Sequence, residues 1–383
     1  MTWRQAMQAA LYGPGGFYAR GEPPARHFRT SVHVSPGYAA AVLDLLREVD
    51  AGLGRPARID LVDVGAGRAE LLEQVLALAS AEPGPAEPGP AGRGLAGREQ
   101  AARGLAARGA AGRGLAGPGP DGRGAAGRGL AGRIAACAVE VAPRPAGLDP
   151  RIRWERVPPA AITGLVIASE WLDNVPLDVV ELTAAGPAVI QVDPATGAQR
   201  PGGLPGPADL AWIRDWWPLR ACGERAETGR TRCAAWAGVI RRIGRGVAVA
   251  ADYGHLRAAR PAGGTLTGYL GGRAVPAIPD GSRDITAHVA LDACAAAGAA
   301  AGAGQTVLTT QRAALRELGL GGRRPPLALA ASDPHGYARA LSRASQDAEL
   351  LDAGGLGGFG WLAQAVGTSL PGPLASLAVV PPG

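Results

Sequence analysis

The 383-residue sequence predicts an α/β protein with a mostly parallel central sheet. The main observation is the stretch RIDLVDVGAGRAELLEQVLALA, which begins at Arg58. Its apolar alternation predicts a buried strand, its glycines predict a tight turn, and the apolar spacing that follows predicts a helix. Further buried strands are predicted in GLVIASEW, from Gly164, and GRGVAVAADYG, from Gly244. Open α/β sheets with such a glycine loop bind their ligands at the carboxyl ends of the strands.

The composition indicates a globular protein without a membrane span. Hydrophobic residues make up 47% of the chain and charged residues 19%. No apolar run approaches the roughly 20 residues that cross a bilayer, and the N-terminus lacks the apolar region of a secretory signal, so a cytoplasmic location is expected. The four cysteines and five histidines are scattered, which predicts neither a disulfide framework nor a metal site.

Residues 80–133 differ from the rest because Arg or Pro recurs at every fifth position from Pro83 onward. A period of five matches neither helix nor strand, and the apolar side chains are mostly Ala, so we expect a disordered insert. A pentapeptide β-helix is the ordered alternative, but it needs bulkier central residues. The segment holds eight arginines against four acids, which leaves the remaining chain nearly neutral despite a net charge of +6. Without aromatic residues to stack on bases, no specific nucleic-acid partner is expected.

The glycine loop indicates the type of cofactor. A dinucleotide site needs a third glycine, and Glu70 stands at that position. The pattern Asp63-Val-Gly65-Ala66-Gly67 is similar to the acidic loop of S-adenosylmethionine (SAM) methyltransferases. An acid at the strand end suits the amine in the methionine part of that ligand. A purely structural turn of similar composition is the alternative.

Glu140 is the candidate ligand for a ribose. It ends the next predicted strand, 73 residues after Gly67, or 19 once the 54-residue insert is removed. In adenosine-binding α/β folds, an acid about 20 residues after the loop accepts hydrogen bonds from the ribose hydroxyls. A surface glutamate without a ligand is the alternative.

Two further carboxylates occur in the stretch ASEWLDNVP, where Ser169, Glu170 and Asp173 follow a predicted strand. In the usual strand order this strand lies beside the first one, so these residues are expected at the mouth of the cofactor pocket. A carboxylate can hold a guanidinium through paired hydrogen bonds and orient one nitrogen toward the methyl group. Alternatively, Asp173 caps the turn before Pro176, and Glu170 contacts only the cofactor.

Several motifs in one order resemble the MidA-like family, which includes the mitochondrial complex I assembly methyltransferase. The similar segments are SEWLDNVP, ADYG, GTLTGY and GSRDITAHV, with LYGPGGFYARG and HFRTS near the N-terminus and TTQRAALRELGL and LGGFGWLAQAVG near the C-terminus. Nearly the whole chain is covered, apart from the insert and about 180–235. The resemblance implies a Rossmann-like, class I SAM-dependent methyltransferase with a seven-stranded, mostly parallel sheet and N-terminal helical and mid-chain additions.

The implied domain organisation places an N-terminal helical cap at residues 1–50. The SAM-methyltransferase domain is expected at 51–79 and 134–383, separated by the insert. Additions around the substrate cleft are expected at about 180–235 and 255–300.

The resemblance also implies the site residues of an enzyme that needs SAM and no metal. His288, in ITAHV, is the base expected for a hydroxyl acceptor, by its position in the family motif. The candidates for catalysis are Glu170, Asp173 and His288, and those for cofactor binding are Asp63, Gly65, Ala66, Gly67, Glu140, Ser169 and Glu170.

The implied activity is methylation of a protein arginine side chain. The expected partner is a protein substrate such as a respiratory complex I subunit, and a homodimer is also expected. Methylation of a small molecule and a catalytically silent assembly factor are the alternatives. The chain departs from the family at His27, at Val32 with His33, and at Ser169. These departures bear on the choice of substrate.

Overall fold

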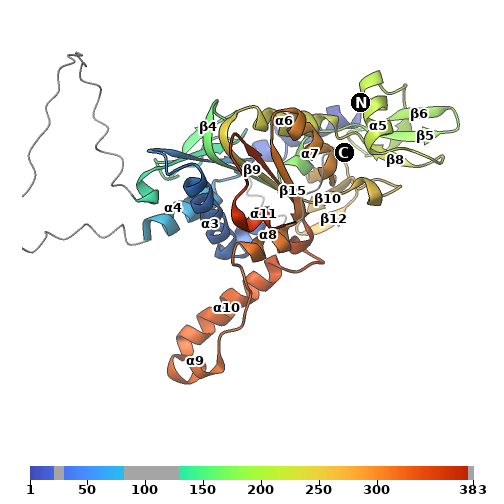
Figure 1. Ribbon diagram of the computed structural model, residues 1–383. Helices are drawn as coiled ribbons and strands as arrows, with labels where there is room; N and C mark the ends of the chain where they lie inside the picture. The colour runs from blue at the N-terminus through green and yellow to red at the C-terminus, as the bar shows by residue number, and fades with distance from the viewer. Residues whose placement is uncertain (21–29, 82–128, 378–383) are drawn as a thin grey trace, which may run out of the picture.

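The computed structural model describes residues 1–20, 30–81 and 129–377. In this part of the chain, a seven-stranded sheet has the order β15-β16-β9-β4-β1-β2-β3 (Figure 1). Strands β9, β4, β1, β2 and β3 are parallel, whereas β16 runs antiparallel to both β9 and β15. The predicted α/β fold with a mostly parallel seven-stranded sheet is therefore confirmed. The strands are β1 (Ile59–Val64), β2 (Ile134–Val139), β3 (Arg153–Glu155), β4 (Ile162–Ser169), β9 (Ile243–Asp252), β15 (Gln305–Thr310) and β16 (Gly360–Val366).

Helices cover both faces of this sheet, which is why the central strands are continuous apolar runs. Successive side chains of a strand point to opposite faces, so Leu61 and Leu165 enter one core whereas Val62 and Val166 enter the other. The first core includes α3 (Pro36–Gly52), α4 (Glu70–Ala81) and α8 (Gln311–Glu317), and the second includes α6 (Arg230–Ile240) and α7 (Leu291–Ala300).

The expected N-terminal cap at residues 1–50 is divided between two places. Helix α1 (Trp3–Met7) packs against β6 (Gly186–Val192), and the π-helical turn η1 (Gln8–Tyr12) packs against β13 (Asp284–Thr286), in a third, separate core. Helix α3 instead lies on the main sheet, because its apolar face, with Tyr38, Val42 and Leu46, is fully buried there. Between them stand η2 (Tyr18–Arg20) and α2 (Ser31–Val34).

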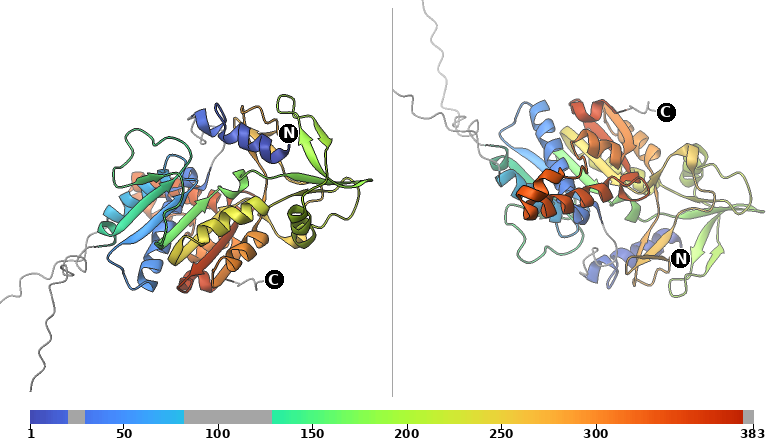
Figure 2. Two further views of the ribbon diagram at one scale, coloured as in Figure 1. Left: turned by 90° about the horizontal axis from the view of Figure 1, so that it is seen from above. Right: turned by 90° about the horizontal axis from the view of Figure 1, so that it is seen from below.

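The mid-chain additions form small sheets of their own. A four-stranded sheet with the order β7-β6-β5-β8 lies at one end of the molecule, beside the N-terminal helix (Figure 2). A three-stranded sheet, β12-β11-β13, and the pair β10-β14 follow later in the chain. The strands are β5 (Val179–Thr183), β6 (Gly186–Val192), β7 (Gln199–Pro201), β8 (Arg225–Glu227), β10 (Gly254–His255), β11 (Thr267–Leu270), β12 (Arg273–Val275), β13 (Asp284–Thr286) and β14 (Val289–Ala290).

The edges of the predicted insert are part of the fold. Helix α4 continues to Ala81, and a 3-10 turn, η4 (Leu130–Gly132), precedes Arg133. The buried Arg133 guanidinium donates to both carboxylate oxygens of Asp50, at 2.7 and 2.6 Å. The predicted boundaries of 80–133 are therefore too wide at both ends. Residues 82–128, on which the prediction of disorder falls, lie outside the described residues.

The remaining helices complete the structure. Helices α9 (Leu327–Ser332) and α10 (Pro334–Leu350) pair and project from the main body (Figure 1). The others are η5 (Leu172–Asn174), α5 (Pro207–Trp216), η6 (Arg257–Ala259), η7 (Leu356–Gly358) and α11 (Gly372–Ala375). No helix of the described ranges is long and apolar enough to cross a membrane.

Candidate active site

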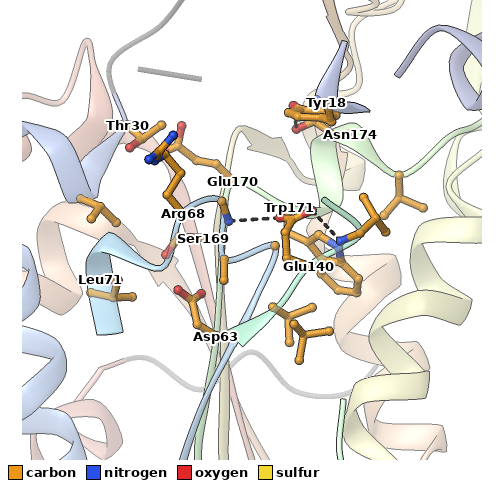
Figure 3. Close-up of a pocket in the computed structure, with 18 of the residues that line it drawn as sticks. Tyr18, Thr30, Asp63, Arg68, Leu71, Glu140, Ser169, Glu170, Trp171 and Asn174 are labelled. Atoms are coloured by element: carbon orange, nitrogen blue, oxygen red, sulfur yellow. Dashed lines mark hydrogen bonds between the residues drawn. The ribbon is translucent and has the colours of Figure 1, made fainter. Parts of the chain in front are cut away.

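A cavity of about 470 Å³ lies at the carboxyl edge of the parallel strands. Its volume is in the range of small-molecule and cofactor sites. The ends of β1, β2 and β4 meet here because these strands are parallel neighbours. All predicted cofactor residues line the cavity: Asp63, Gly65, Ala66, Gly67, Glu140, Ser169 and Glu170. Figure 3 shows several of them around the open centre.

The loop after β1 requires glycine for two reasons: its backbone has positive φ angles, and a neighbouring side chain lies close to it. Gly65 and Gly67 have φ angles of +75° and +57°, in the left-handed region that favours glycine. A Cβ atom added to Gly65 would lie 2.8 Å from Cδ1 of Trp171. The loop therefore approaches the Trp171 side chain as closely as a bare backbone allows, and both line the cavity.

Glu140 is fixed by three backbone amides. Its Oε2 accepts from Gly67 at 3.1 Å, and its Oε1 accepts from Val141 at 2.6 Å and Ala142 at 3.1 Å. These contacts hold the carboxylate at the cavity wall, where it can accept hydrogen bonds from a diol such as a ribose. The role predicted from the spacing therefore fits this geometry.

Asp63 lies at the end of β1 and is buried. Burial, with the negative charges of Glu140 and Glu70, raises the pKa of Asp63 to about 7. A cationic amine in the cavity would supply the missing opposite charge and stabilise the carboxylate form. The donor set of Asp63, the glycine loop and Glu140 therefore fits the amine and ribose of SAM.

Glu170 directly follows β4 and has a left-handed backbone, with φ +52°. Its amide donates to the Ala251 carbonyl at 2.8 Å, and its Oε1 accepts from the Ser31 amide at 3.0 Å. Burial raises the pKa of Glu170 to about 8, and the charges of Asp173 and Asp284 act in the same direction. Such a group can bind or release a proton near neutral pH.

Ser169, the residue before Glu170, is tied to helix α3. Its Oγ lies 2.5 Å from the Tyr38 hydroxyl oxygen. Burial raises the pKa of Tyr38 well above its usual value, so its hydroxyl stays protonated. This contact fixes the side chain at one of the positions where the chain departs from the family.

Asp173 does not line the cavity, which corrects its predicted place at the pocket mouth. It is buried, and its Oδ2 accepts from the Thr286 hydroxyl at 2.7 Å. The turn is held by Asp252, whose Oδ2 accepts from the amides of Leu172 at 2.8 Å and Asp173 at 3.2 Å. The Asp173 side chain therefore lies in the protein interior, on the Thr286 hydroxyl, and not in the cavity.

His288 also lies outside the cavity lining. Its ring stacks on Tyr253, with the ring centres 5.6 Å apart, and its amide donates to the Thr265 hydroxyl at 2.7 Å. Burial and then the charge of Arg232 lower the pKa of His288, so it is neutral at pH 7. The structure therefore places the expected base outside the lining of the cavity.

Several lining residues were not predicted from the sequence. Trp171 and Asn174 follow β4, and Tyr12 and Tyr18 come from the N-terminal segment. The stretch LYGPGGFYARG carries both tyrosines, so the motif itself was the available signal.

His33 also lines the cavity, at a departure from the family. Its Nδ1 lies 2.6 Å from the Thr30 hydroxyl, and its Nε2 lies 3.5 Å from a Glu70 carboxylate oxygen. Burial acts to raise the pKa of Glu70, but the contact with His33 and the hydrogen bonds from the backbone of Glu70 and Arg68 together lower it. The other departure, His27, lies outside the described residues.

Comparisons with known proteins bear on the class of protein. Residues 131–309 match a family described as a putative S-adenosyl-L-methionine-dependent methyltransferase. A crystal structure of a likely methyl transferase from Burkholderia thailandensis bound to S-adenosyl-homocysteine is similar, with a TM-score of 0.73 and 21% identity, over 100% of this chain and 92% of that one. An uncharacterized member of the same superfamily from that organism has a TM-score of 0.69 and 22% identity, over 99% and 90%. No curated protein matches the chain.

The fold and the cofactor residues define a class I methyltransferase that depends on SAM. Residues 131–309 are similar to the family of putative S-adenosyl-L-methionine-dependent methyltransferases, and the resemblance to the MidA-like family is confirmed at this level.

Proposed function

We propose that the enzyme transfers the methyl group of SAM to a guanidinium nitrogen of a protein arginine side chain. The observation that carries the proposal is the carboxyl of Glu170, which lines the cavity beside the glycine loop and has a pKa of about 8. A partly buried carboxylate among other acids is stabilised by a cation, and a guanidinium offers two N–H donors to its two oxygens.

SAM supplies the activated methyl group: the N–C bond forms as the C–S bond breaks, and the electron pair of that bond stays on sulfur. Asp63 and the loop Gly65–Gly67 would hold the amine end, and Glu140 would hold the ribose. Glu170 orients the guanidinium nitrogen and accepts the proton that this nitrogen loses.

The substrate protein is part of this proposal, and a respiratory complex I subunit is the first candidate through the family resemblance. A cytoplasmic location and a homodimer belong to the same proposal. The alternative, methylation of a small molecule, is favoured by His33, because its ring lines the cavity at a departure from the family.

The test uses the full chain with SAM labelled in its methyl group, in a lysate of cells that lack this protein. We expect label in methylarginine after hydrolysis of the protein fraction. Label confined to small molecules would contradict the arginine assignment. Glu170→Gln is the matched variant: it should bind S-adenosylhomocysteine within about twofold of the natural chain, yet incorporate little label. A chain that fails to bind S-adenosylhomocysteine in calorimetry would instead be a silent assembly factor.

A further inference from the structure

One wall of the cavity does not come from the parallel sheet. Tyr12 belongs to η1, Tyr18 to η2, and Asn174 to the turn after β4. Figure 3 shows Tyr18 and Asn174 together, on the side of the cavity away from Asp63. We call these three residues the tyrosine wall. The residues that fit the amine and ribose of SAM lie on the sheet edge, so this wall is left for the second reactant.

The tyrosine wall is rigid because its polar groups bond to one another. The Tyr12 hydroxyl donates to the Asn174 carbonyl at 3.1 Å. The Tyr18 hydroxyl lies 2.9 Å from the Asn174 side-chain oxygen, and the two tyrosine rings stack with centres 5.6 Å apart. Rings fixed in this way lose little conformational freedom when a ligand binds.

A buried acid supports the wall from behind. Asp284 is only 3% exposed. Its Oδ1 accepts from the side-chain amide of Asn174 at 3.0 Å and lies 3.1 Å from the Tyr18 hydroxyl oxygen. Burial and then the Asp284 carboxylate raise the pKa of Tyr12 and Tyr18, so both hydroxyls stay protonated. Asp284 is therefore a positioning residue. Burial and then the charge of Asp173 raise the pKa of Asp284 to about 7, so it carries a partial negative charge near neutral pH.

A buried cation behind Asn174, Arg232, is engaged with backbone carbonyls. Arg232 is 1% exposed and donates to the carbonyls of Val175 at 3.1 Å, Ala287 at 2.8 Å and His288 at 3.0 Å, and also to that of Asp173. It fixes the turn behind Asn174 without lining the cavity. A ligand cation would therefore meet aromatic faces and carboxyl groups at this wall.

We infer that the tyrosine wall is the acceptor subsite and that it binds a cationic nitrogen side chain, a guanidinium in the first place, against the tyrosine rings. The inference rests on the proposed methyl transfer to arginine and names the residues that select its acceptor. A cation over a tyrosine ring is favoured electrostatically, and more so when both are desolvated. A neutral side chain of the same shape loses this attraction.

The test measures binding to the full chain saturated with S-adenosylhomocysteine, so that no turnover occurs. The probes are Nα-acetyl-L-arginine amide and its neutral isostere Nα-acetyl-L-citrulline amide, titrated in a calorimeter. We expect the arginine probe to bind about tenfold more tightly. Tyr18→Leu should weaken binding of the arginine probe by about tenfold and leave the affinity for S-adenosylhomocysteine within about twofold. Tyr18→Phe keeps the ring and should retain most of the affinity for the arginine probe. Tyr337→Leu on α10 is the matched control and should change neither affinity.

Equal affinity for the two probes, no binding of the arginine probe, or an unchanged affinity in Tyr18→Leu would overturn the inference. If Tyr18→Leu does not fold, comparing the affinities of the two probes for the natural chain still tests the inference. The proposed function is judged separately: methylarginine in the lysate experiment supports it even if the tyrosine wall proves irrelevant. Loss of S-adenosylhomocysteine binding by the natural chain would remove both.

Discussion

The backbone N–H of Gly67 donates a 3.1 Å hydrogen bond to the carboxylate of Glu140. The two residues follow β1 and β2, which are parallel neighbours, and are 73 positions apart in the chain. The contact joins the two halves of the proposed SAM site, in which the glycine loop would hold the methionine part and the carboxylate would hold the ribose. It also places both groups before any ligand binds.

Glu140→Ala should weaken S-adenosylhomocysteine binding. The change removes charge-assisted hydrogen bonds worth roughly 1.5–3 kcal/mol, so we expect a loss of about ten- to a hundredfold in calorimetry. Glu155→Gln, at the exposed end of β3, is the matched control and should bind normally. An unchanged affinity in Glu140→Ala would show that the ribose lies elsewhere.

Gly65→Ala should damage the site more than Gly54→Ala. Both glycines have positive φ angles, +75° and +79°, so alanine is strained by roughly 1 kcal/mol at either position. Only at Gly65 would the new Cβ also clash, 2.8 Å from Trp171, whereas nothing lies within 4 Å at Gly54. We expect both variants to lose some thermal stability and Gly65→Ala alone to lose cofactor affinity. Equal affinities in the two variants would rule out the role of the close approach.

Glu170→Gln should change how stability depends on pH. The pKa of Glu170 is raised from 4.5 to about 8 in the folded state. As the pH rises, Glu170 loses its proton in the unfolded chain at a lower pH than in the folded chain. The stability of the natural protein therefore falls between about pH 4.5 and 8 and then levels off. The variant lacks this loss, so it should gain on the order of 3 kcal/mol relative to the natural chain between pH 5 and 9.

Thermal unfolding at several pH values, without ligand, checks this prediction. Asp63 also titrates in both proteins, so its contribution cancels in the difference. A constant difference in melting temperature across the range would contradict the burial of an ionisable Glu170. In kinetics, the rise of kcat/KM through pH 8 should disappear with Glu170→Gln, because the proton acceptor is gone.

Arg133→Ala should destabilise the fold strongly. The Arg133–Asp50 pair is buried, with both side chains less than 10% exposed, and truncation leaves the Asp50 charge unpaired. We expect a loss of about 3–5 kcal/mol in denaturant unfolding. Arg151→Ala breaks the ion pair between Arg151 and Asp149, in which the Arg151 side chain is 52% exposed. This change should lower the free energy of unfolding by about 1 kcal/mol or less. Similar losses in the two variants would contradict the role of burial.

The insert prediction is tested with the boundaries that the fold requires. Deletion of 82–128, with Ala81 joined to Gly129 by a short glycine linker, should preserve S-adenosylhomocysteine binding. Helix α4 and η4 are in contact, so the two ends are close enough to be joined. The wider deletion of 80–133 removes Arg133 and should lower stability. Unfolding of the narrower variant would refute the assignment of this segment as an insert.

Local patterns in the chain singled out residues that line the cavity at the ends of β1, β2 and β4. Alternating apolar residues, two glycines and an acid at a characteristic spacing report on contacts within one strand-loop-helix unit and its neighbour. The pentapeptide period predicts an insert, and its removal brings the spacing from Gly67 to Glu140 to 19 residues. Only the ends of the insert were misplaced, because the Arg133–Asp50 pair spans 83 positions and leaves no local pattern.

The acceptor half depended on the tertiary structure. Whether a side chain beside Glu170 faces the cavity or the interior is decided by Asp252, 79 positions after Asp173, which anchors the turn amides. The Tyr18 hydroxyl bonds to the Asn174 side chain, 156 positions later, because the N-terminal segment packs on the four-stranded sheet that contains β5 and β6. Periodicity describes how neighbouring residues alternate along an element. It does not describe which distant elements pack together, and that packing turned Asp173 away from the cavity and brought the tyrosines to it.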